Sequence, residues 1–377
     1  MFGNTHPMID SHVHIRGCKH NSVKDMIRIN HEIRCKLGLD SVCVASLQAG
    51  GLNSVEQNAL CILFKMTYPD CYAYAGLDHY YCGADRTAEG YLLQVKTFME
   101  MGFDGIKFIE YKPTCYKLLE AGFTDERFAL CFSYLEENRI PVLWHVADPE
   151  QNWDAAKCSI EAVENGWCYA DGTFAKKEEL YAEVESVLKR FPNLNIVFAH
   201  LYYLSADIDR LERFLVHYPN VRIDVTPGPS MYYNFNRDRS RWQEFFIKYK
   251  KRILFGTDNG WDDISYAQNV VEGCSQIIMM DGFFTTDQPV LAWDGTMIQG
   301  LALPDETICC LYKSNFMDMQ YGKAPKKVNS MIATEYIQSV LSGVINDQTV
   351  CVETKEQLIQ VLGLLQDNEV ERRDFEV

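Results

Sequence analysis

Short apolar segments alternate with longer amphipathic segments along most of the chain. Short apolar runs of this kind are typical of strands whose two faces are both covered. We therefore predict eight strands. They lie at residues 7–15, 41–47, 71–77, 105–109, 140–146, 195–201, 221–225 and 253–256.

The segments between these strands repeat apolar residues at helical spacing. In the first, residues 22–37, Met26, Ile29 and Ile33 are three and four positions apart, and Gly38 follows as a stop signal. The pattern predicts a helix after each strand. The other helices are predicted at residues 54–66, 87–101, 124–138, 175–190, 205–218 and 238–251. Residues 266–319 are predicted to be helical, with interruptions at Gly282, Pro289 and Pro304.

Eight strand–helix units of this size predict an α/β fold, a (β/α)8 TIM barrel. An open doubly wound sheet is the alternative, but the turn after the first strand lacks the glycine-rich pattern that such sheets use to bind phosphate. We assign residues 1–325 to the barrel. Residues 326–377 form a C-terminal extension, with helices predicted at 330–341 and 355–366 that pack on the barrel.

Composition limits the classes of partner. The chain has 377 residues, of which 47% are hydrophobic, so a large core can form. The net charge of −16 argues against nucleic acid or an anionic membrane as a partner, because phosphate binding needs clustered Lys and Arg. No apolar stretch approaches the ~18 residues of a membrane span. We expect a small-molecule substrate, and a homo-oligomer is compatible with the sequence.

The 14 cysteines are scattered through apolar patterns, and no CxxC motif occurs. This distribution favours free thiols in a reducing compartment over a disulfide framework. The first residues show no basic region followed by an apolar run, so no signal peptide is expected. Both observations predict a cytoplasmic location.

The first strand carries polar residues at every second position: Asp10, His12 and His14. Side chains alternate faces along a strand, so these three point the same way. Two imidazoles so placed can bind one metal ion with a carboxylate behind them. A half-buried strand with two polar histidines on its wet face would give the same pattern.

Three further titratable residues end predicted strands. His145 lies near the end of the fifth, His200 ends the sixth and Asp258 ends the eighth. The carboxyl ends of barrel strands form the rim that carries catalytic residues. Each residue alone could be a helix cap or a hydrogen-bonded strand end. Four of the nine histidines lie at this rim, however, so the set predicts a metal centre.

This combination resembles the amidohydrolase superfamily of metal-dependent barrel hydrolases, and it is most similar to the amidohydrolase 2 branch that also holds aromatic-acid decarboxylases. The resemblance implies one divalent ion, zinc or alternatively manganese. The ligands that it implies are His12, His14, His145 and Asp258. It also implies that His200 either binds a second ion or acts on the substrate.

The fourth strand separates the one-ion and two-ion members of this family. Two-ion members place a carboxylated lysine or a glutamate there, and this chain has Lys107 followed by Glu110. Lys107 could instead be an inward-facing ammonium that pairs with Asp10 or another carboxylate, or that binds a substrate anion. We favour this second interpretation and therefore one ion, with two as the alternative.

These residues allow a specific chemistry. Zinc makes hydroxide available near neutral pH, Asp258 can accept and return the proton, and His200 can polarise a carbonyl. Asp10 is expected to orient a ligand from behind. We predict an amidohydrolase-like hydrolase in which metal-activated water attacks an amide, lactone or ester bond. The alternatives are a metal-dependent decarboxylase of an aromatic or unsaturated acid, and an inactive metal-binding barrel.

Overall fold

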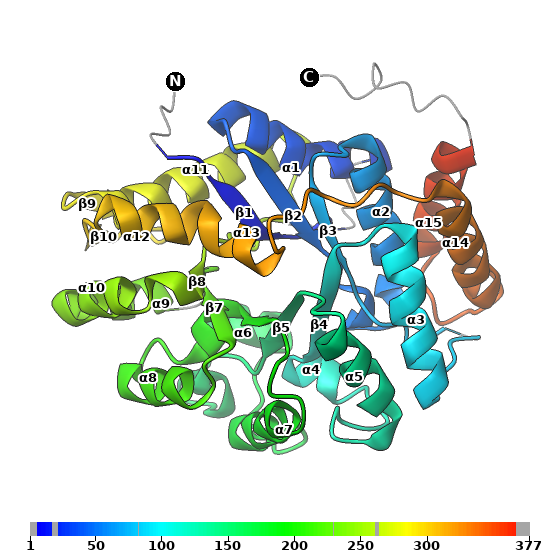
Figure 1. Ribbon diagram of the computed structural model, residues 1–377, viewed down its shortest axis with the longest axis horizontal. Coiled ribbons are helices and arrows are strands. Elements are labelled where there is room, and N and C mark those ends of the chain that lie inside the picture. The colour runs from blue at the N-terminus through cyan, green and yellow to red at the C-terminus, as the bar shows by residue number, and fades with distance from the viewer. Residues whose placement is uncertain (1–5, 17–21, 82, 229, 261–263, 367–377) are drawn as a thin grey trace.

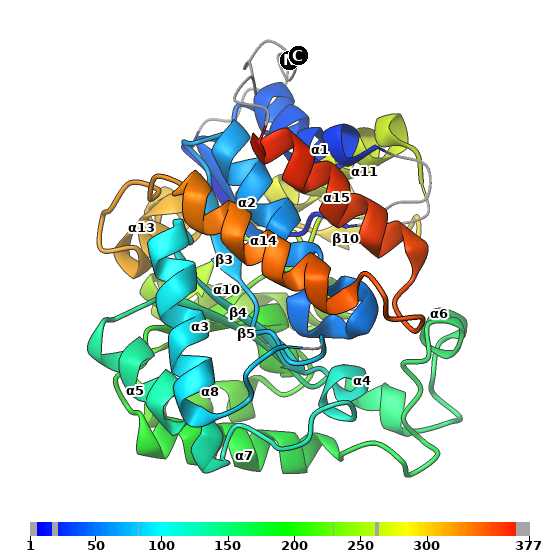
Figure 2. The ribbon, with the colours of Figure 1, turned by 90° about the vertical axis from the view of Figure 1, so that its right-hand side faces the viewer.

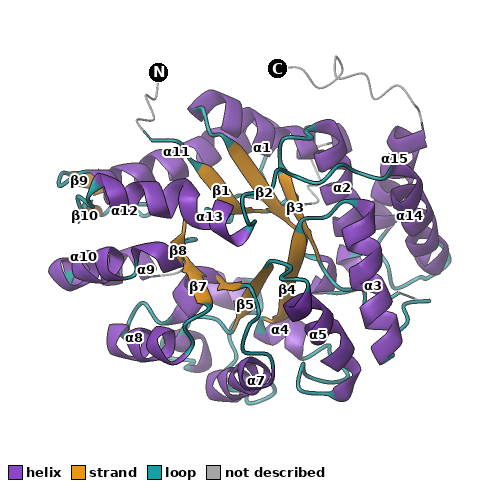
Figure 3. Ribbon diagram, viewed as in Figure 1, coloured by secondary structure: helices purple, strands orange, loops and turns teal. Residues whose placement is uncertain are grey.

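The computed structural model describes residues 6–16, 22–81, 83–228, 230–260 and 264–366. Within these ranges, parallel strands form a central ring with helices around it (Figure 1; Figure 3). The predicted strands all occur, and the (β/α)8 barrel is confirmed. The eight strands are β1 (Ile9–Val13), β2 (Ser41–Ala45), β3 (Tyr72–Ala75), β4 (Gly105–Tyr111), β5 (Val142–Val146), β6 (Ile196–Phe198), β7 (Val221–Asp224) and β8 (Ile253–Leu254).

The ring closes between β8 and β1. Neighbouring strands pair in chain order from β1 to β8. The Ser11 amide donates to the Phe255 carbonyl at 3.0 Å, and the Asp258 amide donates to the His12 carbonyl at 2.8 Å. These bonds join the last strand to the first, so the open-sheet alternative is excluded. They also hold Asp258 directly beside the histidines of β1.

Helices cover the outside of the ring. Those between the strands are α1 (Val23–Leu37), α2 (Gln57–Thr67), α3 (Ala88–Met101), α4 (Pro113–Tyr116), α5 (Ala129–Glu137), α6 (Ile160–Glu164), α7 (Lys177–Arg190), α8 (Ile208–His217), α9 (Met231–Arg237) and α10 (Arg239–Lys248). The helix predicted at residues 238–251 is thus confirmed, whereas α9 lies in a segment for which no helix was predicted.

Helix α1 shows how the sequence sets the bounds of an element. The Ser22 side chain accepts the Asp25 amide at 3.1 Å, and the Asp25 carboxylate accepts the Ser22 amide in return. This reciprocal cap satisfies two amides that otherwise lack partners. Gly38 ends the helix with φ of +68°, a conformation that glycine adopts at little cost. The apolar face, including Ile27 and Ile33, is buried against the barrel.

The inside of the barrel is filled below the rim by side chains from alternating strand positions. Helix α13 (Asn315–Met319) adds to this filling from the amino-terminal end of the strands, where the Met319 carbonyl accepts Asn195 Nδ2 at 2.8 Å. The buried side chains of this inner cluster include Ile9, Tyr74, Leu143, Val197, Leu254, Phe316 and Met319. The barrel is therefore a packed core, and polar groups gather at its carboxyl-terminal end.

The helical prediction for residues 266–319 was partly wrong. Helix α11 (Tyr266–Thr285) is followed by an antiparallel hairpin, β9 (Pro289–Leu291) and β10 (Met297–Gln299), before α12 (Asp305–Cys309) and α13. The hairpin turn contains Asp294-Gly295, and Gly295 has φ of +82°. An Asp-Gly pair at such a turn is a strong local signal for a hairpin, and it overrides the helical spacing of the apolar residues around it.

Two C-terminal helices, α14 (Ser330–Val344) and α15 (Val352–Gln366), lie side by side over α2 and α3 (Figure 2). The Tyr336 hydroxyl of α14 contacts α2 and the loop after β3, 2.9 Å from Asn58 Nδ2 and 3.1 Å from the Asp78 carboxylate. Both predicted tail helices are thus present. Residues 367–377 of the predicted extension lie outside the described residues.

No described helix combines the length and the apolar character that crossing a bilayer requires. The prediction that the cysteines are free thiols was wrong for one pair, because Cys158 and Cys168 form a disulfide. Both lie in the long segment between β5 and α7, where their separation of 10 residues gave no recognisable motif. The remaining cysteines of the described ranges are free.

Candidate functional site

Strand β1 presents His12 and His14 to the rim of the barrel, next to Asp258. Nε2 of His14 lies 3.2 Å from Nε2 of His12 and 2.8 Å from Oδ1 of Asp258. Nε2 of His12 lies 3.8 Å from the same oxygen. Among the described residues these three form a group with metal-binding potential, because one ligand atom from each lies within 4.8 Å of the others.

The other ring nitrogens of the two histidines determine their tautomers. Nδ1 of His14 lies 2.5 Å from the Ala45 carbonyl oxygen, which can only accept, so we assign its proton to Nδ1. Nδ1 of His12 lies 2.9 Å from Asp224 Oδ2 and is assigned likewise. Burial lowers the pKa of His12 to about 3 and also lowers that of His14, so both rings are neutral.

With these tautomers, both Nε2 atoms carry lone pairs. Two lone pairs and the Asp258 carboxylate therefore converge on one small volume without a proton between them. Acceptors at 2.8–3.2 Å repel one another unless a cation lies between them. Neutral imidazoles held by a second hydrogen bond, with one carboxylate, are a donor set that suits zinc and similar ions. The residues present therefore fit a divalent metal ion.

Lys107 already brings a positive charge to this place. It extends from β4 into the barrel, and its Nζ lies 3.0 Å from Nε2 of His12. Burial lowers its pKa to about 8, although Asp258, Asp224 and Glu110 act in the opposite direction. Asp10 was one of the carboxylates considered as a partner of Lys107, but the hydrogen bond that the structure shows is to the ring nitrogen of His12.

Asp10 lies behind the metal-binding group. Its carboxylate accepts the Thr257 hydroxyl at 2.6 Å, the Thr257 amide at 3.1 Å and the His12 amide at 3.2 Å. Burial raises its pKa to about 7, although these hydrogen bonds act in the opposite direction. Asp10 therefore ties the backbone of His12 to the residue that precedes Asp258, and this contact supports the orienting role predicted for it.

His145 and His200 lie beside this group and form no part of it. Their ring centroids are 5.0 Å apart, and the ring of His200 lies 5.8 Å from that of His12. Nε2 of His145 faces the Ala147 carbonyl at 3.0 Å, and Nδ1 of His200 faces the Thr226 carbonyl at 3.1 Å. In each ring one nitrogen thus faces a backbone carbonyl.

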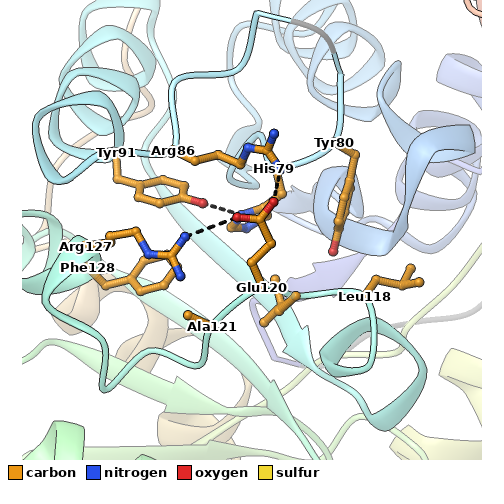
Figure 4. A pocket seen from close by; sticks show the side chains of 10 residues that line it. His79, Tyr80, Arg86, Tyr91, Leu118, Glu120, Ala121, Arg127 and Phe128 are labelled. Carbon is orange, nitrogen blue, oxygen red and sulfur yellow. Dashed lines mark hydrogen bonds and ion pairs between the residues drawn. The ribbon is translucent and has the colours of Figure 1, made fainter.

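Glu110 points away from the histidines of β1. Its Oε1 lies 2.9 Å from Nε2 of His79, whose Nδ1 lies 2.9 Å from the Tyr91 hydroxyl. Figure 4 shows Tyr91 and His79 in the pocket that they line. In the same pocket Arg86 and Arg127, from the loops after β3 and β4, form ion pairs with Glu120. The structure therefore places Glu110 in a separate buried network on the outer face of β4. Of these two residues of β4, Lys107 is the one that contacts the metal-binding group.

The backbone around the rim is unusual. His200, Leu201, Tyr202 and Tyr203 all have φ between +50° and +57°, in a turn directly after β6. Asp258, after β8, also has positive φ. This conformation costs a non-glycine residue about 1–2 kcal/mol, and such strain concentrates at functional sites. The strained turn aims His200 at the space beside His12.

Sequence analysis missed Asp224, which is fully buried at the end of β7. Its Oδ2 faces His12 Nδ1, while its Oδ1 accepts the amides of His200 at 2.8 Å and Thr226 at 3.1 Å. The position of Asp224 was a usable signal, because it lies near the end of a predicted strand at the same rim as His145, His200 and Asp258. Acidic residues are common at strand ends, however, so this position did not distinguish Asp224 from a residue without a functional role.

A second group that sequence analysis missed lies next to His145. Asp148 Oδ1 is 3.6 Å from His145 Nε2, and its Oδ2 accepts the Tyr169 hydroxyl. Burial opposes ionisation of Asp148, but Lys112 and His145 hold its pKa at about 2. Asp148 is therefore an anion at neutral pH and fixes the loop after β5 against the rim.

The chain matches a known protein family. A family model described as "Amidohydrolase" matches residues 82–306. A search of curated proteins finds no match.

Solved structures share the fold at low sequence identity. A putative amidohydrolase from Staphylococcus aureus is 11% identical, with a TM-score of 0.51 over 84% of this chain and 99% of that one. A 2,6-dihydroxybenzoate decarboxylase is 12% identical, with a TM-score of 0.50 over 84% and 100%. IDCase from Metarhizium anisopliae is 11% identical, with a TM-score of 0.50 over 85% and 98%. The family match covers more than half of the chain, and the chain therefore belongs to the amidohydrolase family.

Proposed function

We propose that the chain is a metal-dependent hydrolase that cleaves an amide, lactone or ester bond of a small molecule. The observation that carries the proposal is the convergence of two unprotonated Nε2 atoms, of His12 and His14, on the Asp258 carboxylate. One ion, zinc or alternatively manganese, is the occupancy that this three-residue group supports.

A bound divalent ion would supply Lewis acidity, polarising a substrate carbonyl and lowering the pKa of a water molecule toward ~7. The residues of the chain supply the remaining steps. Asp258 is the exposed member of the group, with 29% of its side chain accessible, whereas His12 and His14 are almost fully buried. It is therefore placed to accept a proton from the attacking water and to return it to the leaving group.

His200 would meet the developing oxyanion with a proton on Nε2 as well as on Nδ1, because a nitrogen that carries only a lone pair cannot donate a hydrogen bond to an oxyanion. Its ring lies beside that of His12, and its turn is held by the Asp224 carboxylate and the Thr226 carbonyl. A preorganised group in such a site stabilises the transition state by roughly 3–4 kcal/mol. Tyr203 stacks on His200 with centroids 5.0 Å apart, which restricts rotation of the imidazole.

The position of His145 leaves two arrangements to test. In the first, His145 acts as a fourth ligand of the single ion. In the second, Lys107 would be carboxylated and His145 and His200 would hold a second ion. The 5.0 Å separation of the two rings and the lowered pKa of Lys107 support the second arrangement as an alternative.

Decarboxylation of an aromatic or unsaturated acid is the second candidate function. One observation favours it: the buried Lys107 ammonium offers a positive charge to a substrate carboxylate inside the rim. The two functions differ in their products. The metal-loaded chain should be incubated with amides, lactones and esters in one panel and with hydroxybenzoates in another.

Acid or amine release in the first panel supports the hydrolase. Carbon dioxide release in the second, with no turnover in the first, would replace the hydrolase by the decarboxylase. Turnover in either panel must be lost in the Asp258→Asn variant, because both chemistries use the same group of residues. Turnover that survives this substitution would contradict both functions.

A further inference from the structure

A second cavity, of about 280 Å³, opens at the end of the barrel opposite the metal-binding group. Segments at the amino-terminal ends of the strands form it: the turn after α5, the residues before β6, the start of β7 and the residue before β8. Three arginines from different segments line it, namely Arg139, Arg222 and Arg252. None of the described residues that line the cavity is acidic, although the chain as a whole carries a net charge of −16.

The hydrogen bonds that the structure shows for two of these guanidiniums go to neutral groups. Arg222 Nη1 donates to Asn195 Oδ1 at 2.9 Å, and Arg252 Nη2 donates to the Tyr218 carbonyl at 2.8 Å. Arg222 Nε is buried without a hydrogen-bond partner. Among the described residues, no carboxylate lies within ion-pair distance of either arginine, and Asp318 acts on Arg222 from farther away.

These two positive charges are close together and partly removed from water. Burial lowers the pKa of Arg222, and burial together with the neighbouring Arg222 lowers the pKa of Arg252 to about 10. Partly buried charges in proteins are normally paired, because an uncompensated charge costs several kcal/mol. An anion between the two guanidiniums would compensate the repulsion between their charges and would accept a hydrogen bond from Arg222 Nε.

The third arginine is held beside them by the end of a helix. Arg139 has φ of +52°, in the left-handed turn that ends α5, where the Ile140 amide donates to the Leu135 carbonyl at 2.9 Å. Its guanidinium lies over the Tyr321 ring, 5.8 Å from the ring centroid. The helix end and this ring thus place Arg139 beside the other two arginines.

We propose that this cavity binds the phosphate group of a small molecule. Guanidiniums from three directions suit a tetrahedral group with several charged oxygens, whereas a planar carboxylate offers two. Arg222 and Asp224 lie two residues apart on the same inward face of β7. One short strand therefore connects the phosphate site to the residue that positions His12. The proposal does not depend on the proposed function.

Isothermal titration calorimetry with the purified full-length chain tests it. Inorganic phosphate and methyl phosphate are titrated, with sodium succinate and sodium chloride as comparison anions. We expect phosphate binding that weakens as ionic strength rises. Arg139→Gln and Arg222→Gln should each weaken it at least roughly 10-fold, the loss expected for one charge-assisted hydrogen bond.

Two control variants make the test specific. Arg190→Gln removes the same charge from a surface arginine that pairs with Glu126, and it should leave phosphate affinity unchanged. His14→Ala disrupts the metal-binding group and should also leave it unchanged. The proposal is overturned if phosphate fails to bind, if succinate binds as tightly, or if binding is lost in His14→Ala but kept in both cavity variants. If Arg222→Gln does not fold, Arg139→Gln decides, because its side chain is exposed.

Discussion

His12 and Asp224 are joined across the barrel, with Nδ1 of His12 2.9 Å from Oδ2 of Asp224 and both side chains buried. The second oxygen of Asp224 accepts the backbone amide of His200 at 2.8 Å. One carboxylate thus determines which nitrogen of His12 is free for a cation and where the turn that carries His200 lies. The metal-binding group and His200 are parts of one hydrogen-bonded unit.

Replacing this carboxylate should weaken metal binding while preserving the fold. In Asp224→Asn the remaining oxygen can accept the amides of His200 and Thr226, but the NH2 group that then faces His12 Nδ1 cannot accept a hydrogen bond, so the tautomer that leaves Nε2 of His12 free is no longer favoured. Metal affinity should fall by roughly 10- to 100-fold, the usual effect of such a partner. Competition with a chelator measures it. Asp287→Asn, an exposed position, is the matched control and should bind metal like the wild type. Equal affinity in both variants would contradict the role of Asp224.

The Asp258→Asn variant tests the proton-transfer role. Loss of a general base lowers rates by roughly 100- to 10,000-fold. Because Asp258 also belongs to the metal-binding group, metal content and circular dichroism must be recorded with the rate. A variant that is folded, saturated with metal and inactive supports the assignment. Near-normal turnover would show that the base is another residue.

Bicarbonate dependence distinguishes one ion from two. A carboxylated Lys107 requires carbon dioxide, which reacts with a neutral amine, and the lowered pKa of about 8 makes that form accessible. Our account favours one ion, so metal content should stay near one per chain when the protein is reconstituted with or without bicarbonate. The Lys107→Gln variant should still bind this ion. A bicarbonate-dependent rise to two ions that disappears in Lys107→Gln would establish the two-ion centre.

Asp78, which anchors the C-terminal helix α14 through Tyr336, should make stability depend on pH. Burial raises its pKa to about 6, although hydrogen bonds from Gln48 and Tyr336 oppose this, whereas an unfolded Asp titrates near ~3.9. The folded state therefore favours the protonated form. The stabilisation that protonated Asp78 gives the folded state is complete below about pH 4 and is lost as pH rises through 6. The loss amounts to about 3 kcal/mol in the free energy of unfolding.

Urea unfolding of the wild type and of Asp78→Asn at pH 4.5 and pH 7.5 measures this contribution. The amide cannot ionise, so the wild type should lose stability relative to the variant as pH rises. A constant difference between the two proteins would show that Asp78 has an ordinary pKa in the folded state.

The eight strands could be predicted because each is a short apolar run, a consequence of burial on both faces of a parallel sheet. The hairpin of β9 and β10 was missed since its apolar residues also match a helical period, and the deciding feature was the local Asp294-Gly295 turn. Helix α9 was missed because it follows the proline-rich segment after β7 directly, where turn residues dominate the pattern.

The candidate site could be predicted as far as residue type and strand position allow. His12, His14 and Asp258 were identified because adjacent strand ends meet in a closed barrel. The left-handed turn at residues 200–203 could not be inferred, since it depends on contacts with β7. The disulfide of Cys158 and Cys168 was missed for a similar reason, because pairing depends on the path of a loop.

Metal analysis of the purified chain tests the central claim most directly. Atomic emission spectroscopy should find about one zinc or manganese ion per wild-type chain, and little in His12→Ala and His14→Ala. His217→Ala, which removes an exposed histidine of α8, should retain the ion. A wild-type protein that is fully active without metal, or variants of His12 and His14 that bind metal as the wild type does, would contradict the account.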